Sequence, residues 1–333
     1  MSALLQVDDL KVHFRLPRAS WLGARPVVHA VDGVSFSVPK GSTFGIVGES
    51  GSGKSTTALG VMRLVDITSG SVTLGDTELS GLQGEELRLA RRRFQIIFQD
   101  PYSSLNPRER AGDIVKEPLD LMDVGAPDER RQRVAELFAQ VGLRPEQQNL
   151  FPHQFSGGQR QRIGVARALA TNPELVICDE PVSALDVAIQ AQILNLLQRL
   201  QDELDLTYLF ISHDLGVVQY ICDEIAVMYL GLIVEQADRI SLFKQPLHPY
   251  TWALLSAVPS ARIRHQCGES RVRLSGDPPS PIDPPGGCRF AGRCPFAESR
   301  CHAETPALRT IFEGHRVACH LVSDAGEAPQ HKL

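Results

Sequence analysis

The chain has 333 residues, of which 43% are hydrophobic and 22% are charged, and its formal net charge is −5 at pH 7. This composition is typical of a globular protein and excludes an intrinsically disordered one. The acidic balance argues against duplex nucleic acid as a partner, because such a partner usually meets a basic face. No run approaches the ~20 apolar residues of a membrane-spanning helix, and the N-terminus lacks the basic start and apolar stretch of a signal peptide. We therefore expect a cytosolic protein that meets a membrane only through its partners.

The N-terminal part of the chain predicts short strands around one helix. Apolar and polar residues alternate over residues 4–14 and 27–38, which is the pattern of two half-buried strands. Phe44–Val47 is a short apolar run that predicts a buried strand, and a glycine-rich stretch then leads into a helix expected over Gly53–Val65. Residues 71–79 predict a further strand and a turn.

The middle of the chain is helical in pattern. From Asn106 to about Asn172, apolar residues recur at spacings of three and four with charges between them. Beyond this section the pattern predicts a strand, an amphipathic helix and two more strands, at Leu175–Cys178, Ala188–Leu204, Tyr208–Ser212 and Ile225–Tyr229. Strands that alternate with helices predict an α/β fold with a largely parallel sheet covered on both faces.

A glycine-rich motif joins the strand at Phe44–Val47 to the helix that follows it. The phosphate-binding loop G-x-x-x-x-G-K-[ST] is matched by Gly48, Glu49, Ser50, Gly51, Ser52, Gly53, Lys54 and Ser55. Backbone N–H groups of such a loop, together with the helix N-terminus, attract phosphate oxygens. We expect Lys54 to bridge the β- and γ-phosphates of a nucleotide and Ser55 to bind Mg²⁺.

Two adjacent carboxylates end the later apolar strand. Val176–Cys178 delivers Asp179 to the strand end, where it is placed to bind Mg²⁺ as the acid of a nucleotide-hydrolysing site does. Glu180 follows directly and is predicted to be the catalytic general base that holds the attacking water. A strand-end pair alone is usually a solvated edge, so this prediction depends on the phosphate-binding loop upstream.

The residues Phe155–Arg162, which read Phe-Ser-Gly-Gly-Gln-Arg-Gln-Arg, complete a set of motifs. Together with the phosphate-binding loop and the later Asp-Glu pair, they resemble the ABC ATPase family. The resemblance implies an ABC-type nucleotide-binding domain with a RecA-like parallel sheet core, an antiparallel β subdomain and an α-helical subdomain at about residues 100–170. It also implies that two such domains sandwich two ATP molecules, so that the Ser156–Gln159 helix of one subunit meets the ATP of the other.

The same resemblance assigns roles to single residues. His213 is implied to contact the γ-phosphate, Gln99 to reach the metal and the attacking water, and Phe14 to stack on adenine. The implied Mg²⁺ ligands are Ser55, Gln99 and Asp179. The implied nucleotide-binding set is completed by Gly48, Ser50, Gly51, Ser52, Gly53, Lys54, Thr56, Ser156, Gly157, Gly158, Gln159 and Asp186.

A closer resemblance is to the ATPases of oligopeptide and dipeptide importers. It rests on Ile97–Pro107, Glu180–Val187 and His248–Leu255, and it covers about residues 4–320. It implies an ATP-hydrolysing subunit that energises import of di- or oligopeptides from the cytoplasmic face of the inner membrane. The implied partners are a homologous ATPase subunit, two transmembrane permease subunits and an extracytoplasmic peptide-binding protein, with no nucleic acid.

Other interpretations remain open at this point. Importers of nickel, glutathione or oligosaccharides share several of these motifs. A soluble ABC protein that acts on nucleic acid or ribosomes usually carries two cassettes or long insertions, and this chain has one cassette and no such insertion. A regulatory or metal-sensing protein without catalysis is disfavoured by the intact set Lys54, Asp179, Glu180 and His213.

The sequence changes in character after Pro259, where proline- and glycine-rich stretches predict a linker. We divide the chain into an ABC ATPase domain, residues 1–258, and a small extension, residues 259–333, which is expected to lack an apolar core of its own. Four cysteines of the extension indicate a metal site: Cys288, Cys294, Cys301 and Cys319. Either zinc or an iron–sulfur cluster suits four thiolates. The spacing lacks the close pairs typical of zinc, and the segment resembles the cluster-bearing tails of dipeptide importer ATPases, which implies a 4Fe-4S cluster.

Overall fold

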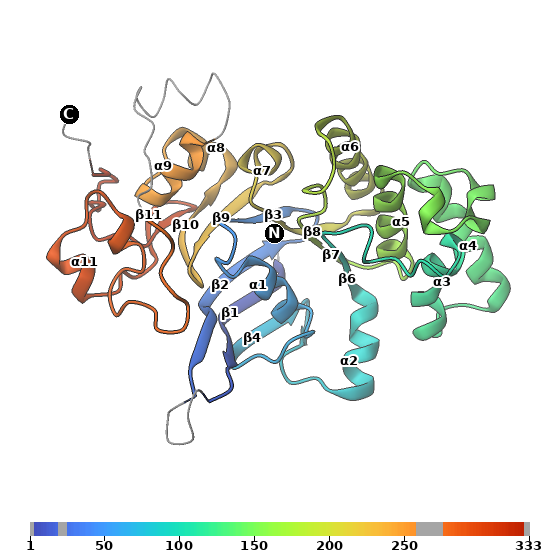
Figure 1. Cartoon of the computed structure of the whole chain (residues 1–333), viewed down its shortest axis with the longest axis horizontal. Coiled ribbons are helices and arrows are strands. Elements are labelled where there is room, and N and C mark those ends of the chain that lie inside the picture. Colours follow the sequence, from blue (N-terminus) through green and yellow to red (C-terminus); the bar gives the residue numbers. More distant parts are fainter. Residues whose placement is uncertain (1–2, 19–24, 258–275, 330–333) are drawn as a thin grey trace. The chain divides into compact units, whose positions relative to one another are not determined.

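The computed structural model describes residues 3–18, 25–257 and 276–329 (Figure 1). The chain divides into two compact units. The first consists of Met1–Leu5, Val38–Ser42 and Thr73–Ile211, and the second of Gln6–Ser37, Thr43–Val72 and Ser212–Leu333. Cys267 and most of the predicted linker lie outside the described residues.

The first unit contains three parallel strands, in the order β8-β7-β6. Their bounds are Phe94–Ile97 for β6, Leu175–Asp179 for β7 and Thr207–Ser212 for β8. Every residue of β7 and β8 is buried. Runs that are apolar throughout therefore form central strands covered on both faces, as the sequence predicts. The short strand β5 (Thr77–Glu78) pairs with the end of β4 (Ser69–Leu74).

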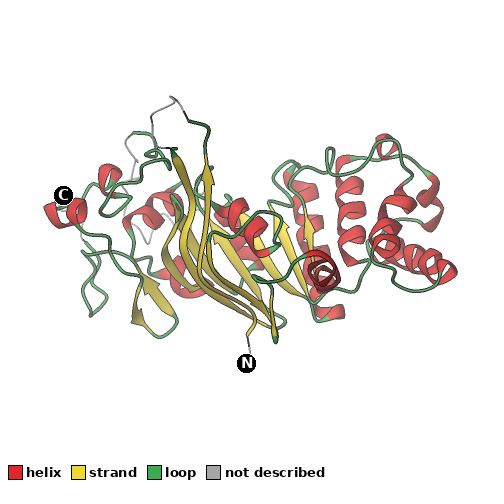
Figure 2. Ribbon diagram, turned by 90° about the horizontal axis from the view of Figure 1, so that it is seen from below, coloured by secondary structure: helices red, strands yellow, loops and turns green. Residues whose placement is uncertain are grey.

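Helices make up the rest of the first unit. They are α2 (Gly84–Ala90), α3 (Ala111–Leu121), α4 (Pro127–Gln140), α5 (Gly157–Leu169) and α6 (Val187–Leu204), with short 3-10 turns at Arg91–Arg93, Pro145–Asn149 and Pro152–Gln154. Helices α3, α4 and α5 pack against one another, and Leu137 and Phe138 are fully buried among them. Figure 2 shows this group as a cluster of helices without strands. The helical section predicted from the periodicity is confirmed.

The second unit contains two groups of strands. One has the order β2-β1-β4, from β1 (Ala3–Arg15), β2 (Val27–Pro39) and β4. The other has the order β3-β9-β10-β12-β11, from β3 (Thr43–Val47), β9 (Glu224–Tyr229), β10 (Leu232–Asp238), β11 (Arg309–Phe312) and β12 (His315–Val317). Strand β3 runs parallel to β9, whereas β10 and β12 pair antiparallel. The helices of this unit are α1 (Lys54–Val61), α7 (Leu215–Ile221), α8 (Arg239–Lys244), α9 (Pro249–Ser256) and α11 (Ser299–Ala303).

The extension differs from the sequence prediction. Strand β12 pairs with β10 in the register Glu235↔Val317 and Gln236↔Arg316, so the end of the chain extends the sheet that holds the phosphate-binding loop. Val317, Cys319 and Val322 form an apolar cluster with Leu247. The expectation of an extension without an apolar core was therefore wrong, because its buried apolar residues pack together with Leu247 and with the partly buried Ile311, Leu321 and Ala328.

The smaller differences concern one element boundary and some missed strands. Helix α1 ends at Val61 rather than at Val65, because Arg63 adopts a left-handed backbone conformation with φ 54 that stops the helix. Strands β6, β10, β11 and β12 were not predicted. In β10 the buried Glu235 and Gln236 interrupt the apolar pattern. Among the described residues, no helix has both the length and the apolar character needed to cross a membrane.

Candidate functional site

The phosphate-binding loop connects β3 to α1 in the second unit. Gly53 precedes the helix with φ 108, and a Cβ there would lie 2.2 Å from the carbonyl oxygen of Ala30, so only glycine fits. Lys54 is buried, with 4% of its surface exposed, and its Nζ donates to the carbonyl oxygens of Gly48 and Glu49, both at 2.9 Å. The loop thus wraps around the Lys54 ammonium, and Ser55 and Thr56 open the first turn of the helix. This arrangement is the cradle that phosphate oxygens require.

Phe14 and His213 also belong to the second unit. Phe14 lies near the end of β1 with 41% of its surface exposed, so its ring is accessible to a planar ligand. His213 is exposed and follows β8 directly. The next residue, Asp214, caps α7 by accepting hydrogen bonds from the N–H groups of Gly216 and Val217. The roles assigned to Phe14 and His213 stay predictions.

The carboxylates predicted for catalysis lie together with Gln99 in the first unit. Asp179 is the last residue of β7 and is buried. Gln99 Nε2 donates to Glu180 Oε2 at 2.9 Å, although the two residues are 81 positions apart. Glu180 has φ 47, and its N–H donates to the carbonyl of Ile211 at 2.9 Å. A left-handed backbone at a residue other than glycine is uncommon, and such conformations concentrate at functional sites.

The Ser-Gly-Gly-Gln stretch begins α5. Ser156 accepts a hydrogen bond from the N–H of Gln159 at 3.3 Å, and the Gln159 side chain accepts one from the N–H of Ser156 at 3.0 Å, which forms a capping box. A Cβ at Gly158 would lie 2.6 Å from Ile189 Cγ2, so the second glycine allows α5 and α6 to pack closely. Asp186 caps α6 by accepting a hydrogen bond from the N–H of Ile189 at 3.0 Å, so it also stabilises the start of that helix.

The four extension cysteines all belong to the second unit. Cys301 and Cys319 are buried and Cys288 and Cys294 are half-buried. The N–H of Cys288 donates to the carbonyl of Cys301 at 2.7 Å. Burial is the main reason that the pKa values of Cys294 and Cys319 rise to about 11, and the charge of the neighbouring Cys288 contributes to the same rise. Among the described residues, no three cysteine sulfurs lie within 4.8 Å of one another. The thiols are therefore close enough to influence one another's charge, and no three of them form a compact group among the described residues.

Comparison with known proteins supports the motifs. The sequence matches the ABC transporter family over residues 31–183 and the C-terminal region of oligopeptide/dipeptide transporters over residues 234–301. It is 51% identical over 323 residues to the oligopeptide transport ATP-binding protein AppF of Bacillus subtilis (strain 168), across 96% of this chain and 98% of that protein. The chain belongs to the ATP-binding proteins of ABC transporters, in their oligopeptide/dipeptide branch. It is therefore an ATPase of the ABC type, for which ATP and Mg²⁺ are the expected ligands.

Other relatives and solved structures agree with this family. The di/tripeptide transport ATP-binding protein DppF of Pseudomonas aeruginosa (strain UCBPP-PA14) is 45% identical, across 96% of this chain and 98% of that protein. A dimeric post-hydrolysis state of the ATP-binding cassette MJ0796 bound to ADP and Pi matches with a TM-score of 0.62 and 29% identity, covering 71% of this chain and 98% of that one. The cbiO1 structure from Clostridium perfringens, part of the cbiONQ transporter complex, matches with a TM-score of 0.62 and 25% identity, covering 73% of this chain and 91% of that one.

Some residues around the phosphate-binding loop of this ABC ATPase were not predicted. Tyr250 and Arg293 both contact Glu49, the second residue of the loop. Tyr250 lies in α9, within the stretch His248–Leu255 that the sequence marks only through the family resemblance. Arg293 lies between two predicted metal ligands and carries no periodic signal. Neither contact could be inferred from local pattern.

Proposed function

We propose that this ABC ATPase energises the import of di- or oligopeptides. The observation that carries the proposal is its likeness to peptide transport ATP-binding proteins over nearly the whole chain, including the C-terminal region at residues 234–301. In this proposal the chain pairs with a homologous ATPase subunit and with two permease subunits at the cytoplasmic face of the inner membrane. An extracytoplasmic binding protein delivers the peptide to the permeases.

ATP hydrolysis is proposed to proceed by positioning and charge stabilisation. The buried Lys54 and the N–H groups of its loop bind the phosphates, and Phe14 stacks on the adenine. Ser55, Gln99 and Asp179 are the residues that would hold Mg²⁺, which would neutralise charge on the phosphates. Glu180 takes the proton of the attacking water, and the hydrogen bond from Gln99 orients the Glu180 carboxylate. His213 contacts the γ-phosphate.

The two-subunit site is proposed from the N-terminus of α5. Helix α5 has 13 residues, and its first-turn N–H groups carry the positive end of the helix dipole, which favours a γ-phosphate. The Ser156–Gln159 stretch of one subunit closes on the ATP that its partner holds, and Asp186 lies at the same interface. Segment 101–107 and the helices α3 and α4 transmit this closure to the permeases.

The extension cysteines are proposed to bind a 4Fe-4S cluster. A tetrahedral zinc ion with Zn–S bonds of about 2.3 Å brings four sulfurs to within about 3.8 Å of one another. The sulfurs of Cys288, Cys294, Cys301 and Cys319 are more widely spread, since no three of them lie within 4.8 Å. A cubane cluster holds each thiolate on a different iron and suits the wider spread. The cluster would cross-link the extension and takes no part in ATP hydrolysis.

A metal analysis tests this part of the proposal. Anaerobic purification is expected to give a brown protein with about four irons per chain. Cys294→Ser should bleach the colour and leave ATP binding measurable. A colourless preparation with one zinc per chain and no iron would assign the site to zinc instead.

The catalytic assignment is tested by Glu180→Gln in the reconstituted transporter. ATP turnover should fall by about two to four orders of magnitude, which is the usual contribution of a general base to the reaction rate, while ATP binding persists. The matched control is Glu203→Gln, which changes an exposed carboxylate on α6 that pairs with Arg199. Near-normal turnover of the Glu180 variant contradicts the assignment.

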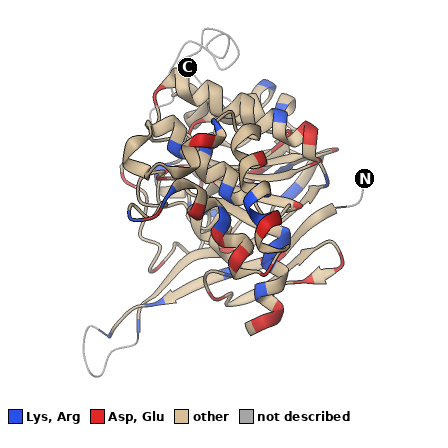
Figure 3. Ribbon diagram, turned by 90° about the vertical axis from the view of Figure 1, so that its right-hand side faces the viewer, with Lys and Arg blue, Asp and Glu red and all other residues tan. Residues whose placement is uncertain are grey.

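The substrate class is tested by uptake into vesicles that contain the whole transporter. ATP-dependent uptake of peptides, and not of nickel, glutathione or oligosaccharides, is the expected result. The alternative of a nucleic-acid partner is disfavoured by the net charge of −5, and on the side that Figure 3 shows, acidic and basic positions are interspersed along the helices. Uptake of a competing substrate alone would reassign the transporter.

A further inference from the structure

Every polar group of Glu49 is bound. This residue lies inside the phosphate-binding loop. Its N–H donates to the Tyr250 hydroxyl at 2.8 Å, and its carbonyl accepts from Lys54 Nζ at 2.9 Å. Its carboxylate forms a two-pronged pair with Arg293, with Nη1 to Oε2 at 2.6 Å and Nη2 to Oε1 at 3.1 Å. The conformation of the loop at Glu49, and with it the place of the Lys54 ammonium, therefore depends on α9 and on the extension.

The Arg293–Glu49 pair differs from an ordinary surface ion pair. The Arg293 side chain is 8% exposed and that of Glu49 is 29% exposed. The hydrogen bonds to Glu49 raise the pKa of Arg293, which keeps its charge at every relevant pH. The guanidinium also lies 3.5 Å from the Tyr229 hydroxyl and 5.9 Å from the centre of that ring. Bidentate arginine–carboxylate pairs in such partly buried places are stronger and more directional than exposed pairs.

Arg293 belongs to the segment between Cys288 and Cys294, two of the proposed metal ligands. The 3-10 turn Ala291–Arg293 is closed by hydrogen bonds from Ala291 N to Cys288 O at 2.9 Å and from Cys294 N to Ala291 O at 3.3 Å. Phe290, 1% exposed, packs edge-on against Tyr229 and at a tilt against Tyr250, with ring centres 5.3 and 5.4 Å apart. The segment that carries Arg293 therefore also supports Tyr250, the residue that binds the Glu49 amide.

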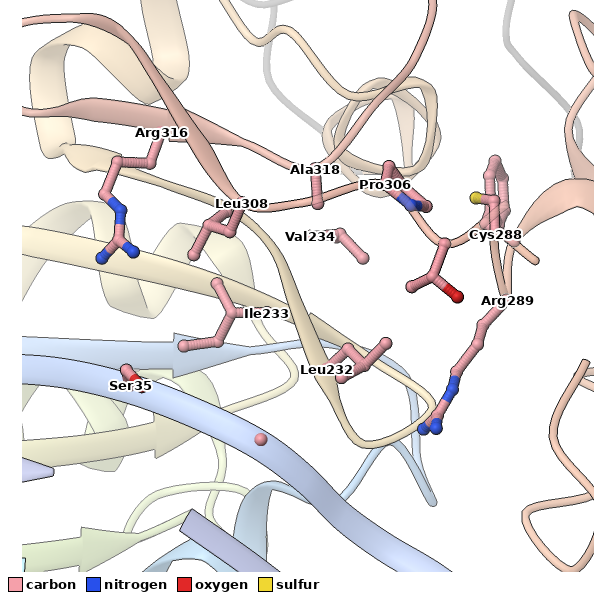
Figure 4. Close-up of a pocket in the computed structure, with 13 residues that line it drawn as sticks. Ser35, Leu232, Ile233, Val234, Cys288, Arg289, Pro306, Leu308, Arg316 and Ala318 are labelled. Carbon is pink, nitrogen blue, oxygen red and sulfur yellow. The ribbon is translucent and has the colours of Figure 1, made fainter. Parts of the chain in front are cut away.

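A second arginine of the same segment anchors it to the strands beside the loop. Arg289 donates to the Asp32 carboxylate and to the Leu230 carbonyl. The neighbouring Gly231 N–H donates to the carbonyl of Ser52, within the phosphate-binding loop, at 2.8 Å. Figure 4 shows Cys288 and Arg289 next to each other at a pocket of about 240 Å³ that β10 and the extension line. The segment 288–294 is thus linked to the phosphate-binding loop in two ways. Arg293 binds Glu49, and Arg289 binds the Leu230 carbonyl next to Gly231, whose N–H binds Ser52.

We propose that Arg293 is a positioning residue for ATP binding. It holds the Glu49 carboxylate in place and offsets its negative charge within the phosphate-binding loop. ATP affinity therefore depends on whether the segment 288–294 is well ordered. Without Arg293, the Glu49 carboxylate is left unpaired in a loop that must accept the negative phosphates of ATP. The positioning role requires only that the chain binds ATP. The dependence on the order of the segment rests on the proposed metal site at Cys288 and Cys294.

The first experiment measures ATP affinity of the full chain by calorimetry. Arg293→Ala should bind ATP about tenfold more weakly, which is the change in affinity expected from the loss of one charge-assisted hydrogen bond. In the assembled transporter the KM for ATP should rise by a similar factor, while kcat at saturating ATP changes less than about twofold. The matched control is Arg300→Ala in the same extension, whose pair with Glu304 is exposed, and it should match the wild type. An Arg293 variant with unchanged affinity and KM overturns the proposal.

A double-mutant cycle separates positioning from misfolding of the extension. Glu49→Gln leaves the extension intact and removes the charge that Arg293 offsets, so it should weaken ATP binding less than Arg293→Ala does. Combining the two substitutions should cost no more than Arg293→Ala alone, because both act on one contact. Losses that simply add would show that Arg293 acts through another contact, which overturns the positioning role.

The dependence on the metal site is tested by removing the metal. Chelation, or Cys294→Ser, should weaken ATP binding in the otherwise wild-type chain and have little effect in the Arg293→Ala background. Metal loss without a change in ATP affinity would show that the segment holds its place unaided, which overturns the coupling. Absence of bound metal from the anaerobically purified chain contradicts the cluster, and the effect of Arg293→Ala is measured independently of that result.

Discussion

Glu235 of β10 offers the sharpest test of how the extension is attached. Its side chain has no exposed surface, and its two oxygens accept three hydrogen bonds. These come from the N–H groups of Leu247 at 2.6 Å and His248 at 2.9 Å and from Nε2 of His315 at 2.8 Å. One carboxylate therefore joins β10, the start of α9 and strand β12.

Replacing Glu235 with leucine keeps a similar size and leaves three buried donors without an acceptor. Each such donor costs about 1–3 kcal/mol, and breaking a buried charged contact typically costs about 3–5 kcal/mol. Burial of the added apolar atoms returns about 1–2 kcal/mol. We expect a net loss of about 2–4 kcal/mol, which is a large share of the ~5–15 kcal/mol that stabilises a typical domain.

Urea unfolding followed by tryptophan fluorescence, together with hydrogen exchange of the β12 amides, measures the effect. Glu235→Gln should lose about 1–2 kcal/mol, since an amide keeps one acceptor oxygen. The exposed Glu304 provides the control, because Glu304→Gln should change stability by less than about 0.5 kcal/mol. If Glu235→Leu lowers the free energy of unfolding by less than about 1 kcal/mol, the reasoning is refuted, because water would then be satisfying the three donors.

Two further outcomes follow from single contacts. Gly158→Ala should destabilise the protein by about 1–2 kcal/mol in thermal unfolding, since its Cβ would meet Ile189 at 2.6 Å. Gly164→Ala, in the same helix with nothing within 4 Å of the new Cβ, should instead stabilise it by about 0.5–1 kcal/mol. Burial lowers the pKa of His248 to about 3, and its Nδ1 must stay unprotonated to accept from the Tyr250 N–H at 3.0 Å. The unfolded chain takes up this proton below about pH 6.5, so stability should rise with pH between about 3 and 6.5. His248→Asn, which keeps a capping acceptor, should show a shallower pH dependence; an unchanged slope would contradict the assignment.

The parts predicted well are those in which local sequence decides. The apolar run at β7 and the glycine-rich loop after β3 are contiguous, so their conformations follow from pattern and backbone sterics. Gln99 and Glu180 are 81 residues apart, and they meet because each follows one of two neighbouring parallel strands, although the strand before Gln99, β6, was not predicted. Parallel topology thus brings strand ends together without any further signal.

The parts that could not be predicted depend on distant partners. Arg293 and Glu49 are 244 residues apart, and nothing in a proline- and cysteine-rich stretch marks one arginine as a partner of the phosphate-binding loop. Glu235 interrupts an apolar run, and its full burial depends on three donors from other parts of the chain. The spread of the four thiols also required coordinates, since residue spacing does not give sulfur separation.

The pairing of β10 with β12 has a consequence for synthesis on the ribosome. His315 is translated 80 residues after Glu235, so β10 emerges with an open hydrogen-bonding edge and a carboxylate whose third donor does not yet exist. An unpaired edge strand is a template for association with other chains. The nascent second unit therefore passes through an interval of aggregation risk that ends only when the extension arrives. Slow translation of the extension, or its truncation, should send newly made chains to chaperones before it affects any ATP chemistry.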